Sequence, residues 1–244
     1  MKSALPHPLD NPVWTALSTA QTHLRQGDGL ACRYPSDVAP FAALETHTPD
    51  AWQALGRLLL PGEQVALLSE APAAPGPQFG TQSVGVIHQM MAGGQALANV
   101  NRPDARTLAP ADLKHPDSMT LTLADAQDML DLAQKTKPGP FCARTREMGR
   151  YIGIRDQGRL VAMAGERMHP AGYVEISAVC VDQDWRGKGI AGRLISQLHA
   201  RILQRGETPF LHVLSTNHNA IALYERLGFT LRKTFFLTLI GHAK

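Results

Sequence analysis

A glycine-rich basic turn in the second half of the chain has the composition of a phosphate-binding site. Residues 186–192 read Arg-Gly-Lys-Gly-Ile-Ala-Gly, and the apolar positions that follow have helical spacing. The turn is therefore expected at a helix N-terminus, where free backbone N–H groups and the positive end of the helix dipole attract anions. Small residues let a phosphate reach the amides, because a Cβ would hold it away. Taken alone, the stretch also fits a solvated basic turn.

A second group of residues lies downstream, on a helix predicted to begin at Asn217. Asn217 and Tyr224 are separated by nearly two helical turns, so both should project from one face. A phenol has an ordinary pKa of about 10, so Tyr224 would be a proton donor at neutral pH. The structural alternatives are a tyrosine buried in a helix interface and an asparagine that only caps the helix.

Together the two stretches resemble the acetyl-CoA motifs of the GNAT superfamily of N-acyltransferases. Arg186, Gly189 and Ala191 match its Arg/Gln-x-x-Gly-x-Gly/Ala signature. Residues 217–229 match its second motif, Asn-x-x-Ala-x-x-x-Tyr-x-x-x-Gly-Phe. The resemblance covers about residues 118–240 and is to bacterial-type members, here with an extra N-terminal domain. It implies an N-acetyltransferase that moves an acetyl group from acetyl-CoA to a primary amine by direct nucleophilic attack, without a metal.

The resemblance also implies a fold and a set of cofactor contacts. The fold is α+β, with a mostly antiparallel central sheet that is flanked by helices and splayed between its fourth and fifth strands. The pantetheine arm would lie in the gap against strand backbone, and the glycine turn would hold the pyrophosphate. The expected cofactor-binding residues are Val179, Cys180, Val181, Arg186, Gly187, Lys188, Gly189, Ile190, Ala191, Gly192, Asn217, Asn219 and Tyr224.

Two residues are the expected catalytic groups. The phenol of Tyr224 is close to an aliphatic thiol in pKa, which makes it the expected acid for the departing CoA thiolate. Glu175 is the expected base for the amine, because alternation along the strand at 173–181 puts it on the same side as Val179. The alternative for Glu175 is an ion pair with Arg155 or Arg167, and the second choice of base is Glu166.

Composition limits the class of protein. The 24 basic and 21 acidic residues give a net charge of +3, which is not the charge excess of a nucleic-acid-binding protein. No apolar run approaches the roughly 18 residues of a membrane span, so no membrane partner is expected. Cys32, Cys142 and Cys180 have neither disulfide nor zinc spacing, which predicts a cytoplasmic protein without a metal. Oligomeric state stays open.

The first half of the chain carries no motif. Residues 106–117 read as a linker, between an N-terminal α/β domain at 1–105 and a GNAT acetyltransferase domain at 118–244. The N-terminal domain is either a degenerate half-copy of the same fold or a plain packing domain. Predicted strands cover 30–33, 64–68, 83–91, 119–123, 151–155, 160–167, 173–181, 209–214 and 229–240, and predicted helices 12–25, 52–60, 125–134, 190–205 and 217–228.

The sequence leaves the acceptor open. An amino acid, a polyamine, a drug-like amine and a protein terminus all fit, and the acyl chain length is equally open. The proline-containing loop at 135–146 covers the acceptor site in the family, so Phe141, Arg144 and Thr145 are candidate contacts. A different class of function also stays open, a catalytically silent acyl-CoA-binding module that regulates a partner.

Overall fold

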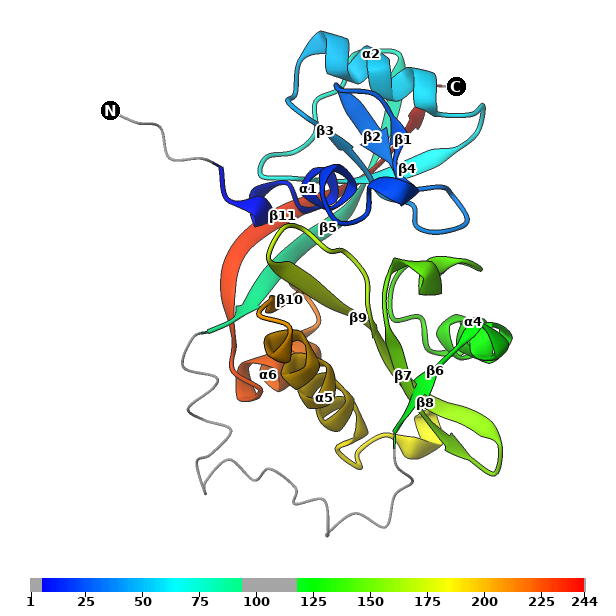
Figure 1. Ribbon diagram of the computed structural model, residues 1–244. Helices are drawn as coiled ribbons and strands as arrows, with labels where there is room; N and C mark the ends of the chain where they lie inside the picture. The colour runs from blue at the N-terminus through cyan, green and yellow to red at the C-terminus, as the bar shows by residue number, and fades with distance from the viewer. Residues whose placement is uncertain (1–5, 94–117, 244) are drawn as a thin grey trace.

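The computed structural model describes residues 6–93 and 118–243, and two sheets form its framework (Figure 1). The large sheet has the strand order β4 (Gln64–Ser69), β11 (Phe229–His242), β5 (Phe79–Ala92), β10 (Thr208–Leu214), β9 (Tyr173–Val181), β8 (Arg159–Glu166), β7 (Tyr151–Asp156) and β6 (Met119–Leu121). The small sheet has the order β1 (Gln26–Gly27), β2 (Ala31–Arg33) and β3 (Ala42–Leu44). Only β9 and β10 pair in parallel among the described strands, so the expected mostly antiparallel sheet is confirmed.

Helices cover the sheets in three places. Helix α5 (Ile190–Gln204) and helix α6 (His218–Arg226) pack on one face of the large sheet, and α4 (Ala126–Thr136) packs on the other face of its β6 to β9 end. Helices α1 (Pro12–Ser18) and α2 (Pro49–Leu58) lie at the opposite end, against the small sheet (Figure 1). Among the described residues, no helix combines the length and hydropathy that crossing a bilayer requires.

Most of the predicted elements are present, with one helix shorter than expected. The helix predicted over 12–25 ends at Ser18, and a short 3-10 turn follows at Thr22–Leu24. Between them lies Gln21, whose buried amide donates to the carbonyls of Met148 at 2.8 Å and Arg167 at 2.7 Å. These bonds join the first half of the chain to the second at the point where the helix stops.

Strand β5 belongs to the first half of the chain but lies deep in the large sheet. It pairs with β10 on one side and β11 on the other, and β4 adds the edge strand beyond β11. The predicted linker at 106–117 lies outside the described residues, so the division into two domains stays a prediction, as does the half-copy hypothesis. The strands on either side of that segment nevertheless share one sheet and its core.

A β-bulge in β9 reverses the alternation that the sequence predicts. Ala178 has a φ of 51°, and the register with β8 slips between Met163 and Gly165, so one extra residue sits in β9. Before the bulge, Ile176 faces the α5 side, whereas after it Val179 faces that side and Cys180 packs under α4. The prediction that alternation continues through this strand is therefore wrong, because a bulge shifts every later side chain by one position.

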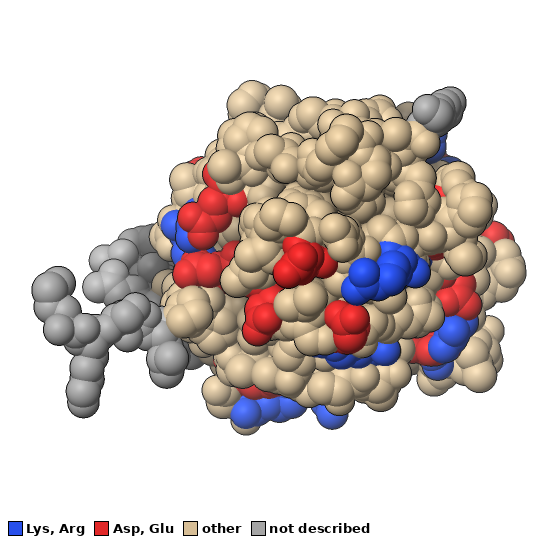
Figure 2. Space-filling view, turned by 90° about the horizontal axis from the view of Figure 1, so that it is seen from above, with Lys and Arg blue, Asp and Glu red and all other residues tan. Residues whose placement is uncertain are grey.

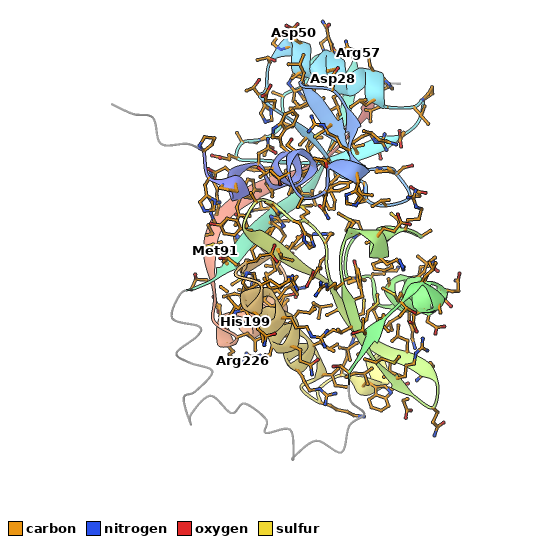
Figure 3. The ribbon with its side chains drawn as sticks, in the orientation of Figure 1. Asp28, Asp50, Arg57, Met91, His199 and Arg226 are labelled. Carbon is orange, nitrogen blue, oxygen red and sulfur yellow. The ribbon has the colours of Figure 1, made fainter. Side chains whose placement is uncertain are left out.

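Side chains fill the space on both faces of the sheets (Figure 3). The α5 face holds a core of aliphatic residues from β7, β8, β9 and α5, and a separate core lies between α2, the small sheet and the β4 end of the large sheet. Asp50 and Arg57 point outward from α2 at the top of Figure 3. Seen from that end, acidic and basic side chains are interspersed in small groups over a largely uncharged surface (Figure 2).

Candidate active site

The large sheet opens between β9 and β10. The two strands are paired only where residues 173–175 meet residues 208–210, and they are not paired beyond Glu175. The expected splay between these strands is thereby confirmed. A cavity of about 1220 Å³ is lined from both sides of this opening, with residues 176–179 and Val181 on one side and His212 to Leu214 on the other.

The glycine turn forms one end of the cavity. Gly187 and Gly189 have φ of 75° and 72°, a region that favours glycine, and Gly189 is the N-cap of α5. A Cβ on Gly187 would meet no described atom within 4 Å, so the backbone conformation and not crowding requires glycine there. No side chain caps the first turn of α5, which leaves its N–H groups available to an anion. Arg186, on the same turn, is anchored through its Nε to the carbonyl of Val181 at 3.2 Å.

Helix α6 contributes the second motif to the same cavity. Asn217, Asn219 and Tyr224 all line it. The Oδ1 of Asn217 accepts from the Ala220 N–H at 3.2 Å, so this residue caps the helix as well as facing the cavity. Burial raises the pKa of Tyr224 to about 12, and its ring packs against Phe229 at 6.3 Å between centroids. The phenol is therefore protonated throughout the neutral range, as a proton donor must be.

Glu175 is fully buried and does not line the cavity, although its two partners, Arg167 and His212, do. Its carboxylate accepts from Arg167 at 2.6 and 2.8 Å, and from Nδ1 of His212 at 2.7 Å. Burial by itself would raise the pKa of Glu175, but the charge and hydrogen bonds of Arg167 and His212 outweigh it and hold that pKa well below its usual range. The Glu175 carboxylate is therefore not open toward the cavity. Of the alternatives given above for Glu175, the structure has the ion pair with Arg167.

The second-choice base is enclosed in the same way. Glu166 is buried. Its carboxylate pairs with Arg205 at 2.9 Å, and Nε2 of His169 lies 3.8 Å from it. It does not line the cavity.

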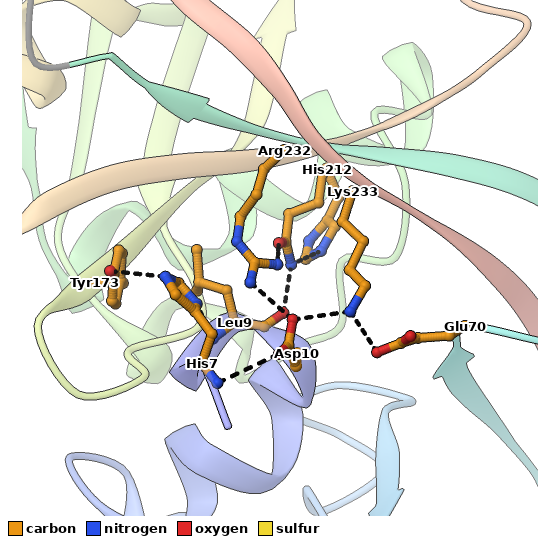
Figure 4. Close-up of polar contacts among 9 residues, drawn as sticks. His7, Leu9, Asp10, Glu70, Tyr173, His212, Arg232 and Lys233 are labelled. Carbon is orange, nitrogen blue, oxygen red and sulfur yellow. Dashed lines mark hydrogen bonds and ion pairs between the residues drawn. The ribbon is translucent and has the colours of Figure 1, made fainter. Parts of the chain in front are cut away.

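A polar network continues from His212 to the surface (Figure 4). Nε2 of His212 contacts Nε2 of Gln89 at 3.2 Å, and Oε1 of Gln89 accepts from Arg232 at 2.9 Å. Arg232 also pairs with Asp10 at 2.7 Å, and Lys233 pairs with Asp10 at 3.0 Å. Gln89 also donates from Nε2 to the Leu9 carbonyl at 3.0 Å. This bond fixes the orientation of the amide, so that its oxygen faces Arg232 and its nitrogen faces His212. The network fixes the ring of His212 and ties the N-terminal segment to the site.

The structure brings most of the expected cofactor residues to one cavity. Two of them do not line it: Cys180 is buried in the core under α4, where burial raises its pKa to about 11, and Lys188 lies over the Trp185 ring at 4.6 Å. The expected residues that do line the cavity are Val179, Val181, Arg186, Gly187, Gly189, Ile190, Ala191, Gly192, Asn217, Asn219 and Tyr224.

The loop at 135–146 meets the cavity with its first part only. Residues 136–140 line it. Arg144 instead pairs with Asp37 and Glu147, and the buried Thr145 hydroxyl donates to the Val38 carbonyl at 2.6 Å. Phe141 packs edge-on against Tyr151, with ring centroids 5.9 Å apart. These three candidate contacts therefore hold the loop in place and do not line the cavity.

The sequence did not indicate the residues that the first half of the chain adds to the site. Phe41 and Leu68 line the cavity beside Arg167 and His212. Their motif-free surroundings gave no functional signal, and His212 has no spacing that separates it from the other histidines. The pairing of β4 with β11, the bridge from Phe41 to Ala66, and the pairing of β5 with β11 and β10 bring these segments together.

Proteins with similar sequences or structures include several that are named as acetyltransferases. The FR47-like protein family model matches residues 151–237. N-alpha-acetyltransferase RimI of Mycobacterium tuberculosis is 35% identical over 118 residues, which is 43% of this chain and 73% of that protein. The [ribosomal protein bS18]-alanine N-acetyltransferase of Salmonella typhimurium is 38% identical over 68 residues, 26% of this chain and 46% of that protein. A crystal structure of a GNAT-family protein from Novosphingobium aromaticivorans is 36% identical, with a TM-score of 0.84 over 98% of this chain and 100% of that one.

Proposed function

This chain belongs to the GNAT family of acetyltransferases, and from that premise we propose that it transfers the acetyl group of acetyl-CoA to a primary amine by direct nucleophilic attack. The observation that carries the proposal is the shared cavity, which the uncapped N-terminus of α5 and the phenol of Tyr224 both line. The N-terminus of α5 suits the phosphates of the cofactor, and the phenol of Tyr224 suits its departing thiolate.

The glycine turn is the proposed pyrophosphate site. Gly187 and Gly189 have the positive φ that is found in loops whose backbone amides cradle an anion, and charge-assisted hydrogen bonds contribute about 1.5–3 kcal/mol each. Arg186 adds positive charge at the same end. The pantetheine arm would extend from there along Val179 and Val181, whose strand edge is not paired with β10.

Tyr224 is the proposed general acid. The neutral amine forms a bond to the thioester carbonyl carbon, the carbon–sulfur bond breaks, and the thiolate takes the proton of the Tyr224 phenol. The amine nitrogen then gives up its extra proton to solvent, and solvent returns a proton to the phenolate, which leaves the amide, CoA thiol and the Tyr224 phenol. Cys180 is not proposed to carry the acetyl group, because its thiol is buried in the core and its raised pKa keeps it protonated. The amine therefore attacks the cofactor directly.

The amine is proposed to enter already neutral. No carboxylate is among the described residues that line the cavity, so solvent is the acceptor of the amine's proton. About 10–20% of an α-amine is neutral at pH 7, against about 0.04% of a lysine-type amine. Two relatives are named as an N-alpha-acetyltransferase and an alanine N-acetyltransferase, and α-amines are the acceptors that we propose here as well.

Release of CoA tests this function. The full-length protein is incubated with acetyl-CoA and a panel of α-amines, and thiol release is followed against pH. We expect steady turnover whose rate rises as pH approaches the pKa of the amine. Tight acetyl-CoA binding without turnover of any amine would instead support the silent regulatory module.

A further inference from the structure

The cavity continues beyond the cofactor residues along a surface built from the first half of the chain and β11. Leu68 and Leu237 are cross-strand neighbours in β4 and β11. Their neighbours along the cavity are apolar as well. We call this surface the apolar wall, and its residues are Phe41, Leu68, Val84, Ile87, Leu237 and Leu239.

The charges around the cavity all have one sign. Four basic residues are among the described residues that line it, and no Asp or Glu is among them. The four are Lys137, Arg167, Arg186 and Arg226. Arg186 lies on the glycine turn, where a phosphate would offset its charge, and Glu175 offsets Arg167. A second cationic group on the acceptor would meet no opposite charge here and would be repelled by Lys137 and Arg226.

The one aromatic ring in the apolar wall already holds a cation. The guanidinium carbon of Arg167 lies 4.9 Å from the centroid of the Phe41 ring. Phe41 is also buried, with only 4% of its surface exposed. An ammonium group on the acceptor would compete with Arg167 for this ring, so the apolar wall itself offers it no free cation–π site.

From the apolar wall and the one-signed charge we propose that the acceptor is an α-amine whose remaining body is apolar and carries no second positive charge. The proposal rests on the acetyltransferase function above and deepens it by naming the class of acceptor. It excludes polyamines and amines with a cationic side chain. The apolar body would displace water from the wall, which is the interaction that such a surface favours.

Norleucinamide and lysinamide form a matched pair of probes, because their side chains have the same number of carbons and differ in the terminal ammonium. Both are titrated by calorimetry into the full-length protein saturated with CoA, and Nα-acetylation from acetyl-CoA is followed by mass spectrometry. We expect norleucinamide to have a dissociation constant at least tenfold lower than that of lysinamide, and a kcat/KM at least tenfold higher. Equal or tighter binding of lysinamide would overturn the proposal. Binding in the expected order without acetylation would contradict only the proposed function.

A charge change in the apolar wall gives a second test. Val84 is 45% exposed at the edge of the cavity, so Val84→Glu can be made without burying a carboxylate. It should lower the preference for norleucinamide at least threefold, whereas the neutral Val84→Gln should not. Leu231→Glu makes the same change at an exposed site outside the cavity and should leave the preference unchanged. If Val84→Glu instead changed only the choice between acetyl-CoA and hexanoyl-CoA, the wall would hold the acyl chain and the proposal would fail.

Discussion

Arg167 and Glu175 form a buried two-point ion pair inside the sheet, with nitrogen–oxygen distances of 2.6 and 2.8 Å. Arg167 extends from the end of β8 and lines the cavity, whereas Glu175 is fully buried on β9. The pair stands at the last point where β9 and β10 are joined, because Phe210 opposite Glu175 is the final paired residue. It therefore anchors the end of the opening in which the cofactor is proposed to lie.

Glu175→Gln should destabilise the fold. Removing one partner of a buried pair leaves the other charge uncompensated, which costs about 3–5 kcal/mol, measurable as a lower midpoint of urea unfolding. Glu147→Gln breaks an exposed pair with Arg144 and should cost under about 1 kcal/mol. If Glu175 were instead the general base, the activity of Glu175→Gln would recover at high pH. An equally stable Glu175→Gln with that recovery would restore Glu175 as the base.

Tyr224→Phe should lower kcat while leaving cofactor affinity nearly intact. The ring and its contact with Phe229 remain, so only the proton donor is lost, and general acids contribute about 10²–10⁴-fold. Raising the pH should not rescue the variant, because the missing group is an acid. Tyr151→Phe removes another buried hydroxyl, outside the cavity, and should leave kcat unchanged. Wild-type kcat in Tyr224→Phe would show a structural tyrosine.

Gly189→Val should raise the acetyl-CoA dissociation constant at least tenfold, or about 1.4 kcal/mol. A β-branched residue resists the φ of 72° and its side chain would stand where the amides meet the phosphate. Calorimetry measures the affinity. Gly158→Val imposes the same backbone conflict, at a φ of 82° in the turn between β7 and β8, and should leave the affinity unchanged. Unchanged affinity in a folded Gly189→Val would remove the phosphate site from this turn.

His199 should make the fold less stable in mild acid. It lies on α5 (Figure 3), and its ring centroid is 5.7 Å from that of Phe229. Burial lowers its pKa in the folded state, and its Nε2 has no hydrogen-bond partner among the described residues. The unfolded chain therefore takes up the proton first, and stability falls as pH drops below about 6.5.

The matching variant is His199→Leu. Its melting temperature should fall less between pH 7.5 and pH 5.5 than that of the wild type. The wild-type loss will not vanish completely, because burial lowers the pKa of His169 in the same direction. An identical pH dependence in the variant would contradict the assignment.

The sequence predicted local elements and motifs well because both depend on neighbouring residues. The predicted strand at 173–181 and the helix beginning at Ile190 have the bounds that the structure gives them, to within one residue. The bulge was missed because Ala178 is not a glycine, so nothing in its identity indicates a positive φ. Glu175 and Val179 are four residues apart and would face the same side of a regular strand. The extra residue at Ala178 explains why they face opposite sides.

The apolar wall could not be predicted for a different reason. Its residues come from four separate segments, and only sheet pairing over long sequence distances makes them neighbours. Leu68 and Leu237 look like ordinary core positions when each is taken within its own strand. The same limit applies to His212, whose role depends on Glu175 and Gln89, neither of which is near it in sequence.

The place of β5 between β10 and β11 has a consequence for the newly made chain. A ribosome releases β5 long before Thr208–Leu214 and Phe229–His242 exist, so both edges of a fourteen-residue strand wait without their partners. Unpaired strand edges are where nascent chains associate wrongly or recruit chaperones. Four of its residues before Gly85, at 81–84, keep polar or exposed side chains through that interval. Synthesis must therefore pass the end of β11 before the sheet can close.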